Sequence, residues 1–211
     1  MKIVHTFGCS WTHGCKGSEV GEMNWVKQLA KKYPNVSFRN HALCGASLEF
    51  SIAQLHEVIK NDPTSIKIFQ ITSPFRFTVW DQDELGFCKI NFKNVNQYSS
   101  KSIEKTERYH GGWNTNRIRE DKKFWKAYIT RQNHYAEKGK FLGLCDYANR
   151  VCDFTFFHQR YGGITDLDIP CVKDEIGEEQ FDKYCWDEGF HFGPEGCQWV
   201  ADWIDNKVNI Q

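Results

Sequence analysis

The 211-residue sequence lacks several features that mark particular classes of protein. Lys and Arg number 27, and so do Asp and Glu, so no net charge attracts the chain to nucleic acid or an anionic membrane. No run approaches the roughly 18 apolar residues of a membrane span. The first residues break at His5 and Gly8 and do not form the apolar core of a signal peptide. These absences predict a soluble, cytoplasmic protein with neither nucleic-acid nor membrane partners.

Paired cysteines are also missing. The nine cysteines stand singly and form no CxxC motif, and their odd number argues against a disulfide framework. The group His5, Cys9, His13 and Cys15 fits no zinc-finger spacing, and His5 is expected inside a strand. The sequence therefore predicts reduced thiols, with no metal and no cofactor.

Hydrophobic patterning alternates between strand and helix from the start of the chain. Period-two or apolar runs predict strands at 2–8, 36–42, 65–72 and 153–159, and amphipathic spacing predicts helices at 22–33, 47–61 and 194–208. Such alternation is typical of an α/β fold with a central parallel sheet and right-handed crossovers. The length fits a single domain over 1–211, at most with an insertion.

The middle of the chain has a weaker pattern. Residues 75–81 and 86–92 are expected to form a hairpin. A helical pattern over 118–152 is expected to be interrupted at Gly139 and Gly143, and a loop is expected after 159. The segment 75–130 is rich in aromatic and basic residues, so it either covers a cleft as a lid or is a packing insert or oligomer contact.

A serine and a distant histidine are the candidate reactive groups. Ser10 follows the first strand, at the edge where parallel sheets bind ligands, although a serine there can also cap a turn. A nucleophilic serine needs a base and an acid that orients it. His191 has Glu188 three residues before it and Asp187 four before. The alternative is that His191 caps the last helix and both carboxylates are solvated.

These pieces together resemble the SGNH (GDSL-type) hydrolases. That family's Gly-Asp-Ser block is similar to "GCS", which carries Gly8 and Ser10 with Cys9 in place of the Asp, and its Asp-x-x-His block is similar to "EGFH". The resemblance implies a three-layer α/β/α, flavodoxin-like fold over most of the chain. It further implies Ser10 as nucleophile and His191 as base, oriented by Glu188 or Asp187.

The resemblance also implies an oxyanion hole, in which the family's pattern is incomplete. The backbone N–H groups of Ser10 and Gly45 would be two donors. The third donor in the family is the Asn of a Gly-x-Asn-Asp block, where this chain has "QITSPFRF". Thr72 falls in the Asn register and Ser73 is adjacent. Loss of one such donor costs about 3 to 4 kcal/mol of transition-state stabilisation.

Two side chains near this block are candidates for substrate binding. Arg76 could compensate for the missing donor or bind an anionic group of the substrate. Trp11 is expected either at the rim of the pocket or in packing. Cys9, beside the nucleophile, is expected to be a packing residue.

Other nucleotide-binding and hydrolase motifs do not fit. The P-loop pattern GxxxxGK[ST] fails because six positions separate Gly8 from Gly14, and Cys15 intervenes before Lys16. The GxSxG elbow fails because Thr12 occupies the second glycine position.

The sequence thus predicts a serine hydrolase acting on an ester or O-acyl group of a small molecule or carbohydrate. The alternative is an SGNH-like module that binds such a ligand without turnover, and the altered third block favours it.

Overall fold

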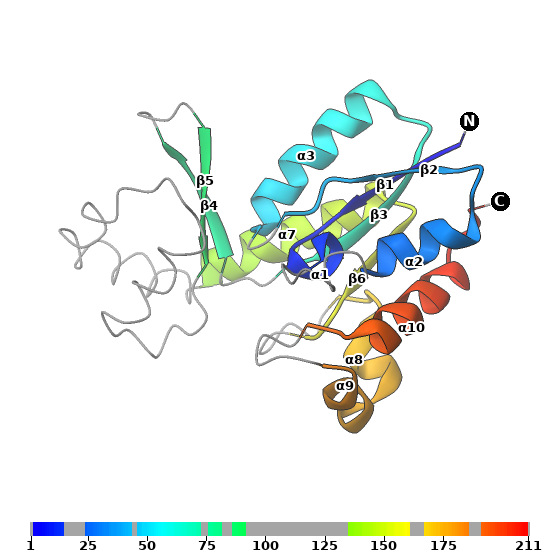
Figure 1. Ribbon diagram of the computed structural model, residues 1–211. Helices are drawn as coiled ribbons and strands as arrows, with labels where there is room; N and C mark the ends of the chain where they lie inside the picture. The colour runs from blue at the N-terminus through cyan, green and yellow to red at the C-terminus, as the bar shows by residue number, and fades with distance from the viewer. Residues whose placement is uncertain are drawn as a thin grey trace.

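A computed structural model describes residues 2–14, 24–43, 46–72, 76–81, 86–91, 135–160, 167–185 and 191–210, with 76–81, 86–91 and 135–138 by their backbone alone. The central sheet consists of β1 (Ile3–Phe7), β2 (Ser37–Asn40), β3 (Ile66–Ile71) and β6 (Phe154–Phe157). All neighbours are parallel, in the order β2-β1-β3-β6 (Figure 1). A parallel bridge between Phe157 and Cys171 continues the sheet beyond β6. The sheet therefore has the doubly wound order of flavodoxin-like folds.

Helices cover both faces of this sheet. The helices are α1 (Ser10–His13), α2 (Trp25–Lys32), α3 (Leu48–Asn61), α7 (Tyr135–Val151), α8 (Val172–Ile176), α9 (Glu178–Tyr184) and α10 (Pro194–Asp205). Val4, Ile68 and Phe156 share one core cluster with apolar residues of α2 and α10. Phe7, Phe69 and Phe157 share the other with residues of α3 and α7. Successive strand residues face opposite sides, so the chain folds as three α/β/α layers, as expected.

Local signals set where the main helices begin. The Asn24 side chain accepts a hydrogen bond from the N–H of Lys27, and that of Ser47 accepts one from Phe50. Both bonds satisfy backbone donors that the first helical turn leaves unpaired. Pro194 occupies the first turn of α10, where its missing N–H costs nothing.

The expected interruption of the helix after residue 118 is wrong for the part that the structure describes. Helix α7 runs unbroken through Gly139 and Gly143, both of which are exposed. Each glycine costs about 1 kcal/mol of helix stability. Burial of Phe141, Cys145 and Ala148 in the cluster of α3 and the sheet offsets that cost.

The connections also differ in part from expectation. The segment expected to be a loop after 159 contains the short helices α8 and α9, and Ser10 lies in the short helix α1. Short helices of one or two turns carry too few residues for a periodic pattern to reveal them.

The expected hairpin is present. Strand β4 (Arg76–Asp81) pairs antiparallel with β5 (Gly86–Asn91) in a separate two-stranded sheet, which Figure 1 shows apart from the central sheet. The rest of the 75–130 segment lies outside the described residues, so its role as a lid or insertion stays a prediction.

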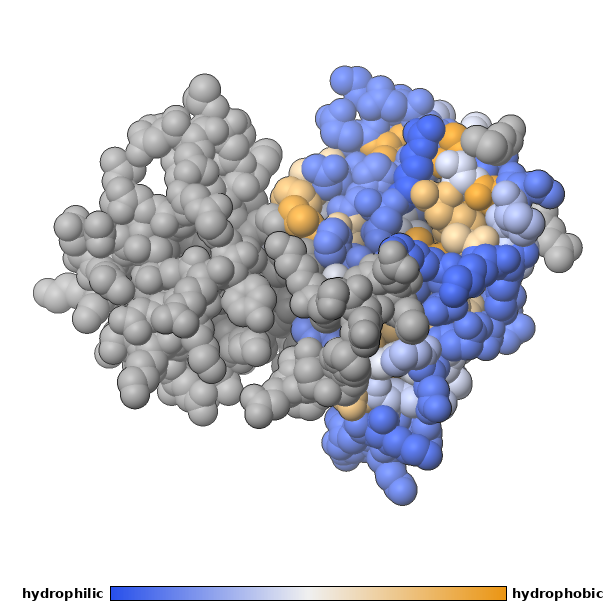
Figure 2. All heavy atoms as spheres, viewed as in Figure 1, coloured by the Kyte–Doolittle hydropathy of each residue, from blue (hydrophilic) through white to orange (hydrophobic). Residues whose placement is uncertain are grey.

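The face of the described part that is visible in Figure 2 is largely polar. Figure 2 shows hydrophilic residues over most of its coloured area, with apolar residues visible in smaller areas between them. Within the described ranges, no helix is both long and apolar enough to cross a bilayer.

The six cysteines whose side chains the structure describes are thiols. Burial raises the pKa of Cys145, Cys152 and Cys197 to about 12. Because the thiolate is the reactive form, a raised pKa makes these three thiols less reactive at neutral pH than an exposed cysteine.

Candidate active site

The carboxyl ends of the parallel strands bring two predicted residues, Ser10 and Thr72, and the unpredicted His158 to one edge of the sheet. Ser10 follows β1, Thr72 follows β3 and His158 follows β6. Ser10 is the first residue of helix α1 and is 7% exposed, so it has little access to bulk water.

Ser10 and His191, the two predicted catalytic residues that the structure describes, are in contact. The Nε2 atom of His191 lies 2.9 Å from the Ser10 Oγ atom, although the two residues are 181 positions apart in sequence. A serine hydroxyl can donate its proton to a neutral imidazole nitrogen at this distance. The structure therefore brings this serine and this imidazole within hydrogen-bond distance, the contact that a serine nucleophile and its base would need.

Residues beside His191 hold it in this place. Phe192 forms an antiparallel bridge with Cys185, and the N–H of Gly193 donates to the carbonyl of Tyr184 at the end of α9 (2.9 Å). The Phe192 ring also packs on Trp11, with 4.3 Å between ring centroids. Phe192, next to His191, thus contacts Trp11, next to Ser10, so this packing holds the two segments against each other at the site.

Helix α10 accommodates the Phe192 ring only because Gly196 has no side chain. A Cβ atom at Gly196 would lie 2.7 to 2.9 Å from Cβ and two ring carbons of Phe192, which is well inside van der Waals contact. Gly196 therefore determines where Phe192, and with it His191, can sit.

The turn that presents Ser10 needs a glycine. Gly8 has φ of +148°, and a Cβ atom there would lie 2.5 Å from Oε1 of Gln70 and 2.7 Å from Oγ1 of Thr12. Both the backbone conformation and the lack of space exclude other residues. Cys9, the next residue, is fully buried in the core, as expected for a packing residue.

Thr72 has an unusual environment. Its side chain is fully buried, yet its Oγ1 atom has no hydrogen-bond partner among the described residues. A buried hydroxyl without a partner costs about 1 to 3 kcal/mol, so such groups are rare in folded proteins. A ligand at this edge of the sheet is one partner that would satisfy it.

The structure leaves several predicted roles open. Asp187 and Glu188 lie outside the described residues, as do Gly45 and Ser73. Arg76 begins β4, but its side chain also lies outside the description. The acid that orients His191, the second oxyanion donor and the binding of substrate by the Arg76 side chain therefore remain predictions.

Two predicted residues have well-defined surroundings. The ring of Trp11 is buried among His158, Phe181 and Phe192. This packing is one of the two expected places for Trp11, and its contact with substrate stays a prediction. His191 does not cap α10, because Gly193 holds the N-cap position.

Sequence reasoning missed the contribution of Gln70. Its side chain is fully buried in β3 and contacts Cys9, Thr12 and His158. A signal was present, because the strand "IKIFQI" places one polar side chain in an otherwise apolar end of the strand. A buried amide there requires polar partners close by.

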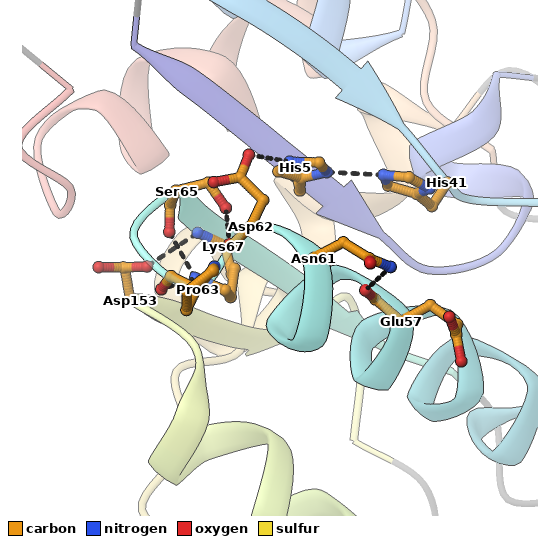
Figure 3. A network of polar contacts seen from close by, with 9 residues as sticks. All are labelled: His5, His41, Glu57, Asn61, Asp62, Pro63, Ser65, Lys67 and Asp153. Carbon is orange, nitrogen blue, oxygen red and sulfur yellow. Dashed lines mark hydrogen bonds and ion pairs between the residues drawn. The ribbon is translucent and has the colours of Figure 1, made fainter.

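A second polar cluster lies along the α3 side of the sheet (Figure 3). The Nδ1 atom of His5 is 2.7 Å from Nε2 of His41, and its Nε2 is 3.2 Å from the Asp62 carboxylate. Burial lowers the pKa of both histidines, and Asp62 opposes this effect at His5. Both imidazoles are therefore more readily neutral than in water. The pair connects the residue after β2 to the end of α3.

Lys67 lies in the same cluster (Figure 3). Its side chain is 4% exposed, and its Nζ atom donates to the carbonyl oxygens of Pro63 (2.9 Å) and Ser65 (2.5 Å). The ammonium thus stabilises the turn between α3 and β3. Across the described ranges, no group of three or more His, Cys, Asp or Glu is arranged to hold a metal ion.

The sequence matches no protein-family model, and a search of curated proteins found no match. Several solved structures are similar to this chain over nearly its whole length. A lipolytic protein of the G-D-S-L family from Veillonella parvula is 12% identical with a TM-score of 0.45, covering 99% of this chain and 100% of that one. A psychrotrophic esterase from Pseudoalteromonas sp. is 10% identical with a TM-score of 0.47, covering 98% and 96%. A variant of an acetyl xylan esterase from Geobacillus stearothermophilus is 11% identical with a TM-score of 0.48, covering 100% and 95%. These similarities concern the fold.

Proposed function

We propose that this protein is a serine hydrolase that cleaves an ester or O-acyl group of a small molecule or carbohydrate. The observation that carries the proposal is the 2.9 Å contact between Ser10 Oγ and His191 Nε2. A serine that merely caps a turn needs no imidazole from the far end of the chain.

The reaction would follow the two steps of acyl transfer. Ser10 Oγ attacks the acyl carbon while His191 Nε2 takes the hydroxyl proton and then gives it to the leaving alcohol. Water, activated by the same imidazole, then cleaves the acyl group from Ser10. Either Glu188 or Asp187 would orient the imidazole.

Three donors would bind the oxyanion that forms in each step. The backbone N–H groups of Ser10 and Gly45 supply two, and the hydroxyl of Thr72 or Ser73 would stand in place of the family's Asn. The buried, unpartnered Oγ1 of Thr72 supports this role, because an oxyanion would give that hydroxyl a partner. Arg76 is a candidate for an anionic group of the substrate.

The test is hydrolysis of short-chain p-nitrophenyl esters by the wild type and by Ser10→Ala. We expect Ser10→Ala to lower kcat by more than about 10³-fold, because it removes the nucleophile. Ser51→Ala is the matched control, since Ser51 is also a buried serine. Its hydroxyl lies in helix α3 and donates to the backbone carbonyl of Ser47, the N-cap of that helix. This control is expected to keep wild-type kcat.

Two results would contradict the proposal. Hydrolysis that survives Ser10→Ala would exclude Ser10 as nucleophile. Saturable binding of an ester without turnover would favour the alternative, a binding module, for which the missing third-block Asn is the supporting observation.

A further inference from the structure

Strand β3 carries a buried amide at its carboxyl end. Gln70 is fully buried, between Phe69 and Ile71, which are also fully buried. Burying an amide costs several kcal/mol unless hydrogen bonds replace those to water. Gln70 must therefore be matched by polar groups nearby, and these come from the turn that carries Ser10.

The oxygen of the Gln70 amide faces this turn. Oε1 accepts hydrogen bonds from the N–H of Cys9 (3.2 Å) and from the hydroxyl of Thr12 (2.8 Å). The N–H of Cys9 belongs to the peptide group directly before that of Ser10. One side chain thus binds residues on both sides of the nucleophile.

Neighbouring groups fix the orientation of the amide. The indole N–H of Trp25 donates to Thr12 Oγ1 (3.3 Å), so the Thr12 hydroxyl directs its own proton to Gln70. At the other end, the Nε2 atom of Gln70 donates to Nδ1 of His158 (3.4 Å). A flipped amide would place its NH₂ group against the Cys9 N–H, donor against donor.

The shape of the turn matches Gln70 as well. A Cβ atom at Gly8 would lie 2.9 Å from Gln70 Cβ and 2.5 Å from its Oε1, so the Gly8 backbone lies directly against this side chain. The turn therefore rests on Gln70 by contact and by hydrogen bonds.

We propose that Gln70 is a positioning residue, whose amide holds the Gly8–Cys9–Ser10 turn so that Ser10 Oγ stays within hydrogen-bond reach of His191. This inference rests on the proposed hydrolase function and extends it to a residue that touches neither substrate nor base. Gln70 acts through the backbone of Cys9 and the hydroxyl of Thr12. Its loss should therefore lower the rate of the chemical step and leave substrate affinity nearly unchanged.

The test compares variants that keep or remove these hydrogen bonds. Gln70→Met keeps the length of the side chain without its polar atoms. Thr12→Val removes the hydroxyl, and Thr12→Ser retains it. Thr155→Val is the matched control, because it removes a buried hydroxyl on β6 that donates to the carbonyl of Ala148 in α7, away from the turn.

The measurements are kcat and KM for a p-nitrophenyl ester, the rate at which a fluorophosphonate labels Ser10, amide hydrogen exchange in residues 8–12, and thermal melting. We expect Gln70→Met to lower kcat and labelling 10- to 100-fold with KM changed less than twofold, and to speed exchange at Cys9. Thr12→Val should lower kcat in the same direction and Thr12→Ser should restore it. Thr155→Val should change melting alone.

The outcomes separate this inference from the proposed function. Wild-type protein that is labelled at Ser10, with Gln70→Met and Thr12→Val labelled equally fast, overturns the role of Gln70 and leaves the hydrolase standing. Wild-type protein that neither hydrolyses esters nor is labelled overturns both. If Gln70→Met fails to fold, the Thr12→Val and Thr12→Ser pair decides the matter.

Discussion

Replacement of Gly196 by alanine tests whether the Phe192 ring sets the position of His191. The new Cβ atom would lie 2.7 Å from Cγ and 2.9 Å from Cβ and Cδ2 of Phe192, where carbon atoms normally approach to about 3.5 Å. Phe192 must therefore move by about 0.8 Å. His191 is its direct neighbour in the chain, so the contact of 2.9 Å with Ser10 should be disturbed as well.

Two opposing terms determine the effect on stability. Overpacking costs about 1 to 3 kcal/mol, and alanine in place of glycine in a helix returns about 1 kcal/mol. The net loss is about 0 to 2 kcal/mol, which corresponds to a fall in Tm of no more than about 8 °C. The protein should remain folded at 25 °C, while kcat for a p-nitrophenyl ester falls about 10- to 100-fold because a displacement near 1 Å misaligns the base.

Gly143→Ala is the matched control for this change. Gly143 also lies within a helix, but a Cβ atom there has nothing within 4 Å. This variant should raise Tm by about 2 to 4 °C, through helix propensity alone, and keep wild-type kcat. Wild-type kcat in Gly196→Ala would show that the position of Phe192 does not set the position of His191.

Two further predictions follow from buried polar groups. Thr72→Val removes a hydroxyl that has no partner among the described residues, so the free energy of unfolding measured in urea should not fall. The same change should lower kcat about 100-fold, because it removes the proposed oxyanion donor. Lower stability with unchanged kcat would contradict this prediction. Burial lowers the pKa of His5 and His41 in the folded protein, so the unfolded chain takes up protons first as the pH falls below about 6.5. The free energy of unfolding should then fall by up to about 1.4 kcal/mol per pH unit for each histidine. Urea titrations between pH 7.5 and 5 should show that the free energy of unfolding depends less steeply on pH in His41→Gln than in the wild type. Equal slopes in the two proteins would exclude this histidine pair as the source of the pH dependence.

The sequence predicts the layers of the fold well because each main element carries its own periodic pattern. Strand β3 has an apolar run that identifies it, and α3 has an amphipathic pattern that begins at a capping serine. The expected break in α7 fails because glycine propensity is a local cost, whereas the burial of Phe141 and Cys145 is a tertiary gain. No pattern within α7 reveals what will pack against it.

The site is predictable only in part, for a similar reason. Ser10 and His191 are identifiable because reactive residue types follow a strand or precede a helix in recognisable blocks. The supports of the site are not identifiable in this way, because they depend on contacts between distant segments. The hydrogen bond from Cys9 to Gln70 spans 61 positions in the sequence. The contact between Trp11 and Phe192 joins helix α1 to the segment that precedes helix α10.

The central claim is that Ser10 is a nucleophile activated by His191. The most direct measurement is the mass of the intact protein and of its peptides after reaction with a fluorophosphonate. We expect one adduct, on the peptide that contains Ser10, forming at a rate that drops sharply in His191→Gln. Absence of an adduct, an adduct on another residue, or labelling of Ser10 at an unchanged rate in His191→Gln would contradict it.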